Sequence, residues 1–213
     1  MSVKPAAAQF ANSPDRVNYS TVNIGAYAGY VSGRLFANAL AKYDYLWVKS
    51  ISPSAGYADR FHGMSYGAQG EAGFRLGNDR FYAEPVATIA YVRTDLNDLH
   101  ALGATVDFDN LDGLRGKAGL RVGSKMEIGG GAVAIVYAQG NYVHEFKGEN
   151  GIAFTSGGTT LDYRNRAIGD YGEGKIGFSV VSASGVTGFV EGFGEDSNSY
   201  KGGGGRAGIR AKF

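Results

Sequence analysis

The strongest constraint on the fold is the strict alternation of the last residues, which run from Arg206 to Phe213. A period of two places successive side chains on opposite faces of a strand. One face then carries three cations, and the other carries Ala207, Ile209, Ala211 and Phe213. Such a strand is typical of a wall with a wet, charged lumen on one side and lipid on the other.

The same alternation recurs along the chain from about residue 19 and predicts about nine strands. Between residues 35 and 47 an unbroken apolar face becomes aromatic only at its far end, where Tyr43, Tyr45 and Trp47 lie. Aromatic strand ends are typical of the girdles that meet the membrane interface. Residues 1–18, with two prolines, are predicted to be loop or tail.

Composition agrees with a chain of many strands and short turns. Of 213 residues, 35 are Gly and 26 are Tyr or Phe, whereas only 4 are Pro. The absence of Cys excludes disulfides and thiolate metal sites. A net charge of +1 argues against a nucleic-acid binder that depends on a basic field. No apolar run is long enough for a membrane-spanning helix.

The connections between the predicted strands alternate between short turns and longer polar loops. Turns near residues 32, 78, 127 and 183 are short or Gly-rich, and loops near residues 55, 102, 157 and 198 are polar and mostly longer. Outer-membrane barrels have this rhythm, with short periplasmic turns. A soluble two-sheet sandwich also explains alternation, but it explains the loop rhythm, aromatic strand ends and terminal Phe213 less readily. The fold class predicted is therefore an all-β, antiparallel transmembrane barrel of outer-membrane type.

Ten charged residues have the parity of the predicted lumen face. They are Glu71, Arg75, Glu84, Arg115, Lys117, Arg121, Glu173, Lys175, Glu191 and Arg210. A charge that faced hydrocarbon would cost about 2–4 kcal/mol at mid-bilayer, which is why parity assigns them inside. They are expected to pair with one another across the wall, or also to line a hydrated path.

Four segments, in order, resemble the C-terminal translocator domain of type V autotransporters of Gram-negative bacteria. The segment Phe81–Tyr91 is similar to that family's aromatic-x-E-P strand, and Leu114–Gly123 to its L-R-G-R-L-G-L-R strand. Asn141–Phe146 resembles an N-x-x-H-E-F motif, and Gly208–Phe213 resembles the family's last residues. The resemblance covers about residues 19–213.

This resemblance implies an outer-membrane barrel that helps an N-terminal passenger reach the cell surface. Its expected partners are membrane lipid, the passenger, and the barrel-assembly machinery, which would recognise the final strand through Ala207, Ile209, Ala211 and Phe213. A full family domain has twelve strands and a helix in the lumen. With about nine strands predicted here, the chain is expected to be incomplete on its N-terminal side. The alternative is a stand-alone small barrel that acts as an adhesin or structural surface protein.

No catalytic, metal or cofactor site is predicted, and the protein is not expected to be an enzyme. Asp95, Asp98 and His100 cluster in one polar loop, and a barrel-embedded protease is the least favoured hypothesis. His144 and Glu145 are adjacent, so on a strand they face opposite ways and cannot form an acid–base pair. The three His residues are far apart, with no metal-ligand spacing.

Overall fold

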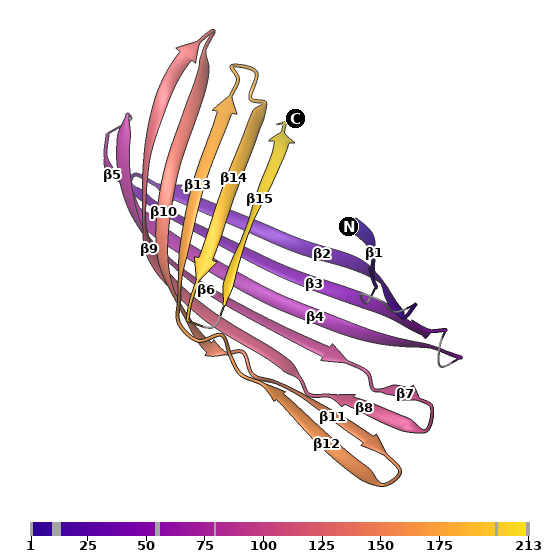
Figure 1. Ribbon diagram of the computed structural model, residues 1–213. Helices are drawn as coiled ribbons and strands as arrows, with labels where there is room; N and C mark the ends of the chain where they lie inside the picture. The colour runs from indigo at the N-terminus through magenta and orange to yellow at the C-terminus, as the bar shows by residue number, and fades with distance from the viewer. Residues whose placement is uncertain (1, 10–13, 54–55, 79, 199, 212–213) are drawn as a thin grey trace.

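A computed structural model describes residues 2–9, 14–53, 56–78, 80–198 and 200–211. All regular elements in these residues are β-strands (Figure 1). The strands are β1 (Ser2–Gln9), β2 (Arg16–Ser32), β3 (Leu35–Ser52), β4 (Tyr57–Phe74), β5 (Leu76–Gly77), β6 (Phe81–Leu96), β7 (Leu99–Ala101), β8 (Ala104–Phe108), β9 (Leu111–Gly129), β10 (Ala132–Lys147), β11 (Asn150–Ser156), β12 (Thr159–Asn165), β13 (Tyr171–Val181), β14 (Thr187–Asp196) and β15 (Lys201–Arg210). The described residues contain no helix that is long and apolar enough to cross a membrane.

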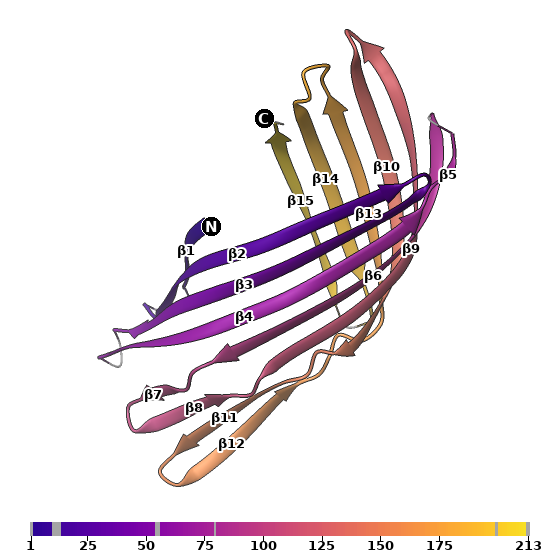
Figure 2. The same cartoon turned by 180° about the vertical axis from the view of Figure 1, so that it is seen from behind.

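One large antiparallel sheet makes up most of the molecule. Its strand order is β1-β2-β3-β4-β6-β9-β10-β13-β14-β15, and β5 pairs with β6. The sheet curls into a deep trough, so that β13–β15 rise in front of β2–β4 (Figures 1 and 2). Among the described residues, no pairing joins β15 to β1 or β2.

A second sheet, with the order β12-β11-β8-β7, is built from two hairpins that extend from one end of the large sheet. At the opposite end the strands are joined by tight turns. Between β9 and β10, for example, Gly130 and Gly131 have positive φ angles of 59° and 70°, a backbone conformation that glycine adopts without steric cost. The predicted alternation of short turns and longer loops is confirmed for the connections from β6 to β9 and from β10 to β13, whereas the connections near residues 55 and 198 are as short as the tight turns.

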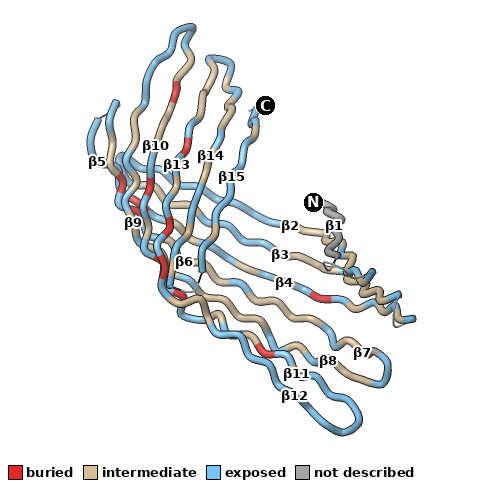
Figure 3. The backbone as a smooth tube through the Cα atoms, viewed as in Figure 1, coloured by how far each residue is buried: buried red, intermediate tan, exposed pale blue. Residues whose placement is uncertain are grey.

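Few residues of the large sheet are buried (Figure 3), and many large apolar side chains are exposed. Ile24, Ile176 and Ile209 are 64%, 63% and 81% exposed, whereas Glu84 and Glu173 are only 1% and 5% exposed. A soluble sandwich buries most of its large apolar side chains and keeps most of its carboxylates in solvent. The pattern here fits an apolar outer wall in lipid and crowded polar side chains on the concave face.

The prediction that residues 1–18 form a loop or tail differs from the structure. Strand β1 covers Ser2–Gln9 and β2 already begins at Arg16. Pro5 and Pro14 were part of the reason to expect a loop, because proline cannot donate a ladder hydrogen bond. Since β1 is the terminal strand of the sheet, Pro5 is at an edge position, where proline is tolerated.

The nine predicted wall strands are all present, as β2, β3, β4, β6, β9, β10, β13, β14 and β15, whereas three predicted loops need correction. The loop predicted near residue 55 is only a short connection, because β3 continues to Ser52 and β4 begins at Tyr57. The loop predicted near residue 102 contains β7 and β8. The loop predicted near residue 157 contains the hairpin β11–β12. Pairing between these two hairpins, which lie far apart in sequence, supplies the order that local polarity did not indicate.

Aromatic rings on β14 cover glycines on β15. A Cβ added at Gly204 would lie 2.9 Å from Cζ of Phe193, and one at Gly208 would lie 2.9 Å from the Phe189 ring. By contrast, a Cβ at Gly174 would meet nothing within 4 Å. The last strand is thus held by rings packed on bare backbone, a known way to stabilise glycine-rich strands.

We expect Gly204→Ala to destabilise the protein by about 1–2 kcal/mol, because the new methyl group displaces the Phe193 ring. Gly174→Ala is the matched control. It adds the same methyl group in open space and is expected to be neutral or slightly stabilising. Urea unfolding of both variants in lipid vesicles tests this. Equal losses would show that the ring contact does not matter.

Candidate functional site: the charged concave face

The strand register places the predicted lumen charges on one face of the sheet. Directly opposed residues of an antiparallel pair share a face. Glu71 lies opposite Thr88, which lies opposite Lys117, and Glu84 lies opposite Arg121. The same reasoning, followed through β10, β13, β14 and β15, places the other predicted residues on this face, namely Arg115, Glu173, Lys175, Glu191 and Arg210. Arg75 joins them through its ion pair with Glu84.

The first cluster is centred on Glu84, whose carboxylate is almost completely buried. Arg75 lies 2.6 Å from one carboxylate oxygen and Arg121 lies 3.2 Å from the other. The guanidinium groups also stack on aromatic rings, with Arg75 at 4.4 Å from the Tyr82 ring centroid and Arg121 at 5.4 Å from that of Tyr137. These contacts satisfy a carboxylate that would otherwise be very costly to bury.

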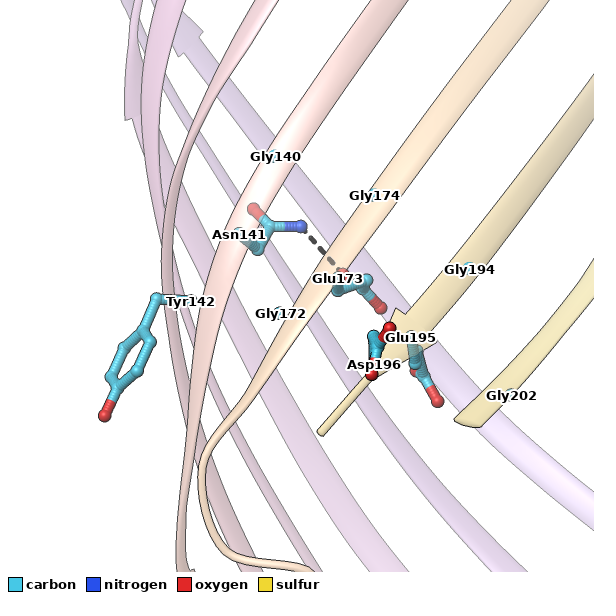
Figure 4. Close-up of a pocket in the computed structure, with 10 residues that line it drawn as sticks. All are labelled: Gly140, Asn141, Tyr142, Gly172, Glu173, Gly174, Gly194, Glu195, Asp196 and Gly202. Carbon is cyan, nitrogen blue, oxygen red and sulfur yellow. Dashed lines mark hydrogen bonds between the residues drawn. The ribbon is translucent and has the colours of Figure 1, made fainter. Parts of the chain in front are cut away.

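The second cluster is centred on Glu173 and is visible in Figure 4. Lys117 donates to one Glu173 oxygen at 2.9 Å, and Asn141 donates to the other at 2.7 Å. Lys175 adds a second cation at 3.3 Å. Tyr142, the neighbour of Asn141, points away from the cluster, as strand alternation requires. Asn141, Tyr142 and Glu173 are among the residues that line a cavity of about 700 Å³.

Three further residues of this face were not among the predicted site residues. Glu145 binds Arg115 at 2.9 Å and also accepts a hydrogen bond from the backbone of Ile168 at 2.7 Å. Arg206 lies 2.9 Å from Glu191, and Gln139 accepts a hydrogen bond from Arg121 at 2.9 Å. All three have the parity of the predicted set, so parity alone was sufficient to find them.

Two of the four predicted assembly residues belong to the last strand. Ala207 and Ile209 belong to β15 and lie opposite Val190 and Gly188, on the face turned away from the charged clusters. Ala211 follows the end of β15. Phe213 lies outside the described residues.

The residues considered for catalysis are not brought together. His100 Nδ1 lies 3.1 Å from the Thr105 hydroxyl, and Asp95 pairs with Arg93. In the described part of the chain, no hydrogen bond or ion pair joins His100 to Asp95 or Asp98. The same residues contain no group of three or more His, Asp or Glu side chains that could hold a metal ion.

His144 lies on the outer face and contacts a loop carboxylate. Its Nδ1 lies 2.5 Å from Asp170, whereas Glu145, the next residue, pairs with Arg115 on the concave face. Hydrogen bonds from Tyr142 and then His144 hold the pKa of the Asp170 carboxyl below its usual value. The predicted separation of His144 and Glu145 onto opposite faces is confirmed.

The curled antiparallel sheet, apolar outside and ion-paired inside, defines a membrane β-barrel wall. Comparison with known proteins supports this. A family model described as the autotransporter beta-domain matches residues 4–192. The chain therefore belongs to the autotransporter beta-domain family. It is an outer-membrane translocator domain of the type V secretion class.

Relatives and solved structures agree with that assignment. The BrkA autotransporter of Bordetella pertussis is 29% identical over 163 residues, which is 73% of this chain but only 15% of that protein. The crystal structure of the transport unit of the Escherichia coli autotransporter AIDA-I has a TM-score of 0.73 at 16% identity, covering 95% of this chain and 69% of that one. The beta domain of the Bordetella autotransporter BrkA has a TM-score of 0.71 at 19% identity, covering 98% and 80%. At these identities the structural likeness shows the fold.

Proposed function

We propose that this domain anchors in the outer membrane and carries a passenger segment, encoded ahead of it, to the cell surface through a lumen lined by its concave face. The observation that carries the proposal is the compensation of buried charge on the polar wall. Glu84 and Glu173 are each held by two cations. The face is therefore hydrophilic, and the charge of each of these two buried carboxylates is compensated. A hydrated, charge-balanced surface offers little adhesion to a polypeptide that slides past it.

The other partners follow from this role. Lipid contacts the apolar outer face, and the barrel-assembly machinery recognises the last strand, from Ala207 to Phe213. The remaining wall strands and the passenger are supplied by sequence upstream of Met1, which fits the 15% share of BrkA that the chain spans. No step of export requires chemistry by the barrel, so we propose that the domain is not an enzyme.

Surface display tests the proposal. The full coding sequence, with its native upstream region and an epitope inserted ahead of Met1, is expressed in a Gram-negative host, and protease is added to intact cells. We expect the epitope to be cleaved while the barrel stays in the outer-membrane fraction. Deletion of residues 171–213 removes β13–β15 and is expected to abolish display. An inserted, heat-modifiable barrel whose epitope stays protected would instead favour a stand-alone surface protein.

Phe213→Ala is expected to lower the amount of folded barrel in the outer membrane several-fold, because the assembly signal would lose its terminal aromatic side chain. Heat-modifiable migration on gels measures the folded fraction. Phe213→Tyr, which keeps an aromatic ring, is the control and is expected to assemble normally. Normal assembly of the Ala variant would refute the role of Phe213.

A further inference from the structure

The outer face carries three cations, Arg16, Lys49 and Arg60, at the loop ends of β2, β3 and β4. These three strands lie side by side (Figures 1 and 2). Lys49 lies directly opposite Asn18 on one side and Arg60 on the other. Arg60 has the opposite parity to Glu71 on the same strand, so these residues face away from the ion-paired concave wall. Arg16, two residues before Asn18, extends the group along β2.

No ion pair within the described residues involves Arg16, Lys49 or Arg60. Like charges directly opposite each other destabilise a sheet, so the Lys49–Arg60 pair has no benefit for the fold by itself. Arg93 differs from these three cations. It lies opposite Tyr66 and therefore on the same outer face. Arg93 is neutralised by Asp95 at 3.1 Å and Asp112 at 4.0 Å.

These cations lie just beyond an aromatic band. Tyr45 and Trp47 precede Lys49 on the same face of β3, and their ring centroids are 4.7 Å apart. Tyr43 lies opposite Tyr66 one step further into the wall. Aromatic bands mark the boundary between hydrocarbon and headgroups, and longer loops mark the outer side of such barrels. The cations are therefore at the headgroup level of the outer leaflet.

A hollow of about 300 Å³ is present at this place. Its outward-facing lining combines polar, cationic and aromatic side chains, namely Asn18, Ser20, Trp47, Lys49, Arg60 and His62.

We propose that this hollow binds the phosphate of a phosphorylated lipid of the outer leaflet, with Lys49 and Arg60 as the phosphate ligands and Trp47 against the apolar part. Lys and Arg suit phosphate oxygens, and a bound phosphate removes the repulsion between the two cations. A lipid is the occupant, rather than free phosphate, because this face is turned to the membrane and the hollow has an aromatic side. The site is independent of passenger export and requires only insertion in the membrane.

Native mass spectrometry of the full-length protein in neutral detergent tests the site. The probes are lipid A, dephosphorylated lipid A and inorganic phosphate. We expect lipid A to bind, and Lys49→Gln and Arg60→Gln each to weaken binding about five-fold, the change that about 1 kcal/mol per cation near a membrane surface produces. Lys49→Arg should retain binding. Arg93→Gln, which removes a neutralised cation from the same face, is the matched control and should leave binding unchanged.

Several outcomes would overturn the proposal. Unchanged lipid A binding in the double variant Lys49→Gln/Arg60→Gln would do so, as would equal binding of the dephosphorylated lipid. Full displacement of lipid A by inorganic phosphate would show a free-anion site instead. The double variant is expected to unfold at the same or a higher urea concentration than the parent in ligand-free detergent, because a like-charge contact is lost. If it fails to fold, each single substitution still gives its five-fold test.

Discussion

The double substitution Arg75→Gln/Arg121→Gln is expected to lower the free energy of unfolding by about 3–5 kcal/mol. It leaves the carboxylate of Glu84, which is only 1% exposed, without either of its cations. Breaking a buried ion pair from one side has this cost because the remaining charge stays desolvated and uncompensated. Equilibrium urea unfolding in lipid vesicles, followed by tryptophan fluorescence, measures the change.

Adding Glu84→Gln to the double variant should restore most of the lost stability, since a neutral amide requires no cation. The control is Lys201→Gln, which removes an exposed pair with Asp196 whose side chains are 79% and 69% exposed. Such surface pairs contribute about 0–1 kcal/mol. A double variant no less stable than Lys201→Gln would mean that the cluster does not compensate the Glu84 charge.

The second large effect is expected from Ala118→Arg, near the middle of β9. Ala118 lies opposite Ala87 and Tyr142 on the outer face, and a cation there would cost about 2–4 kcal/mol in mid-bilayer. Lys117→Ala, one residue away, removes a concave-face charge. Its partner Glu173 keeps Lys175 and Asn141, so the loss should be about 1 kcal/mol.

Folding of both variants into lipid vesicles, measured by heat-modifiable migration and urea titration, compares the two faces at neighbouring positions. Ala118→Ser is a further control, because it changes the same position without adding charge. If Ala118→Arg and Lys117→Ala have equal effects, the assignment of lipid and lumen faces by strand parity is wrong.

The wall of the barrel could be predicted from sequence because its signal is local. In β9 and β15, nearly every second residue is either charged or glycine, and these residues share one face of the paired sheet. The predicted fold class and the shared face of the charged residues follow from this period alone. Glu145 and Arg206 had the same signal.

The hairpins of the second sheet could not be predicted in this way. Apolar residues of β8 and β11 share a face only after Ile152 pairs with Phe108 and Phe154 with Val106. Phe108 in turn stacks on Phe61 of β4, with ring centroids 5.8 Å apart. Each short segment looks polar by itself, since its apolar partners are some 45 residues away along the chain.

The sequence by itself determined which side chains face lipid and which face inward, because a strand's two faces follow from the count of residues. Only the tertiary structure decided which inward charges meet, such as Glu84 with both Arg75 and Arg121, and which outward cations lie side by side, such as Lys49 and Arg60, which form no ion pair within the described residues. The physical reason is register. A slip of one residue between strands would turn every side chain to the other face, and the register is fixed by pairing over the whole curled sheet rather than by any one strand.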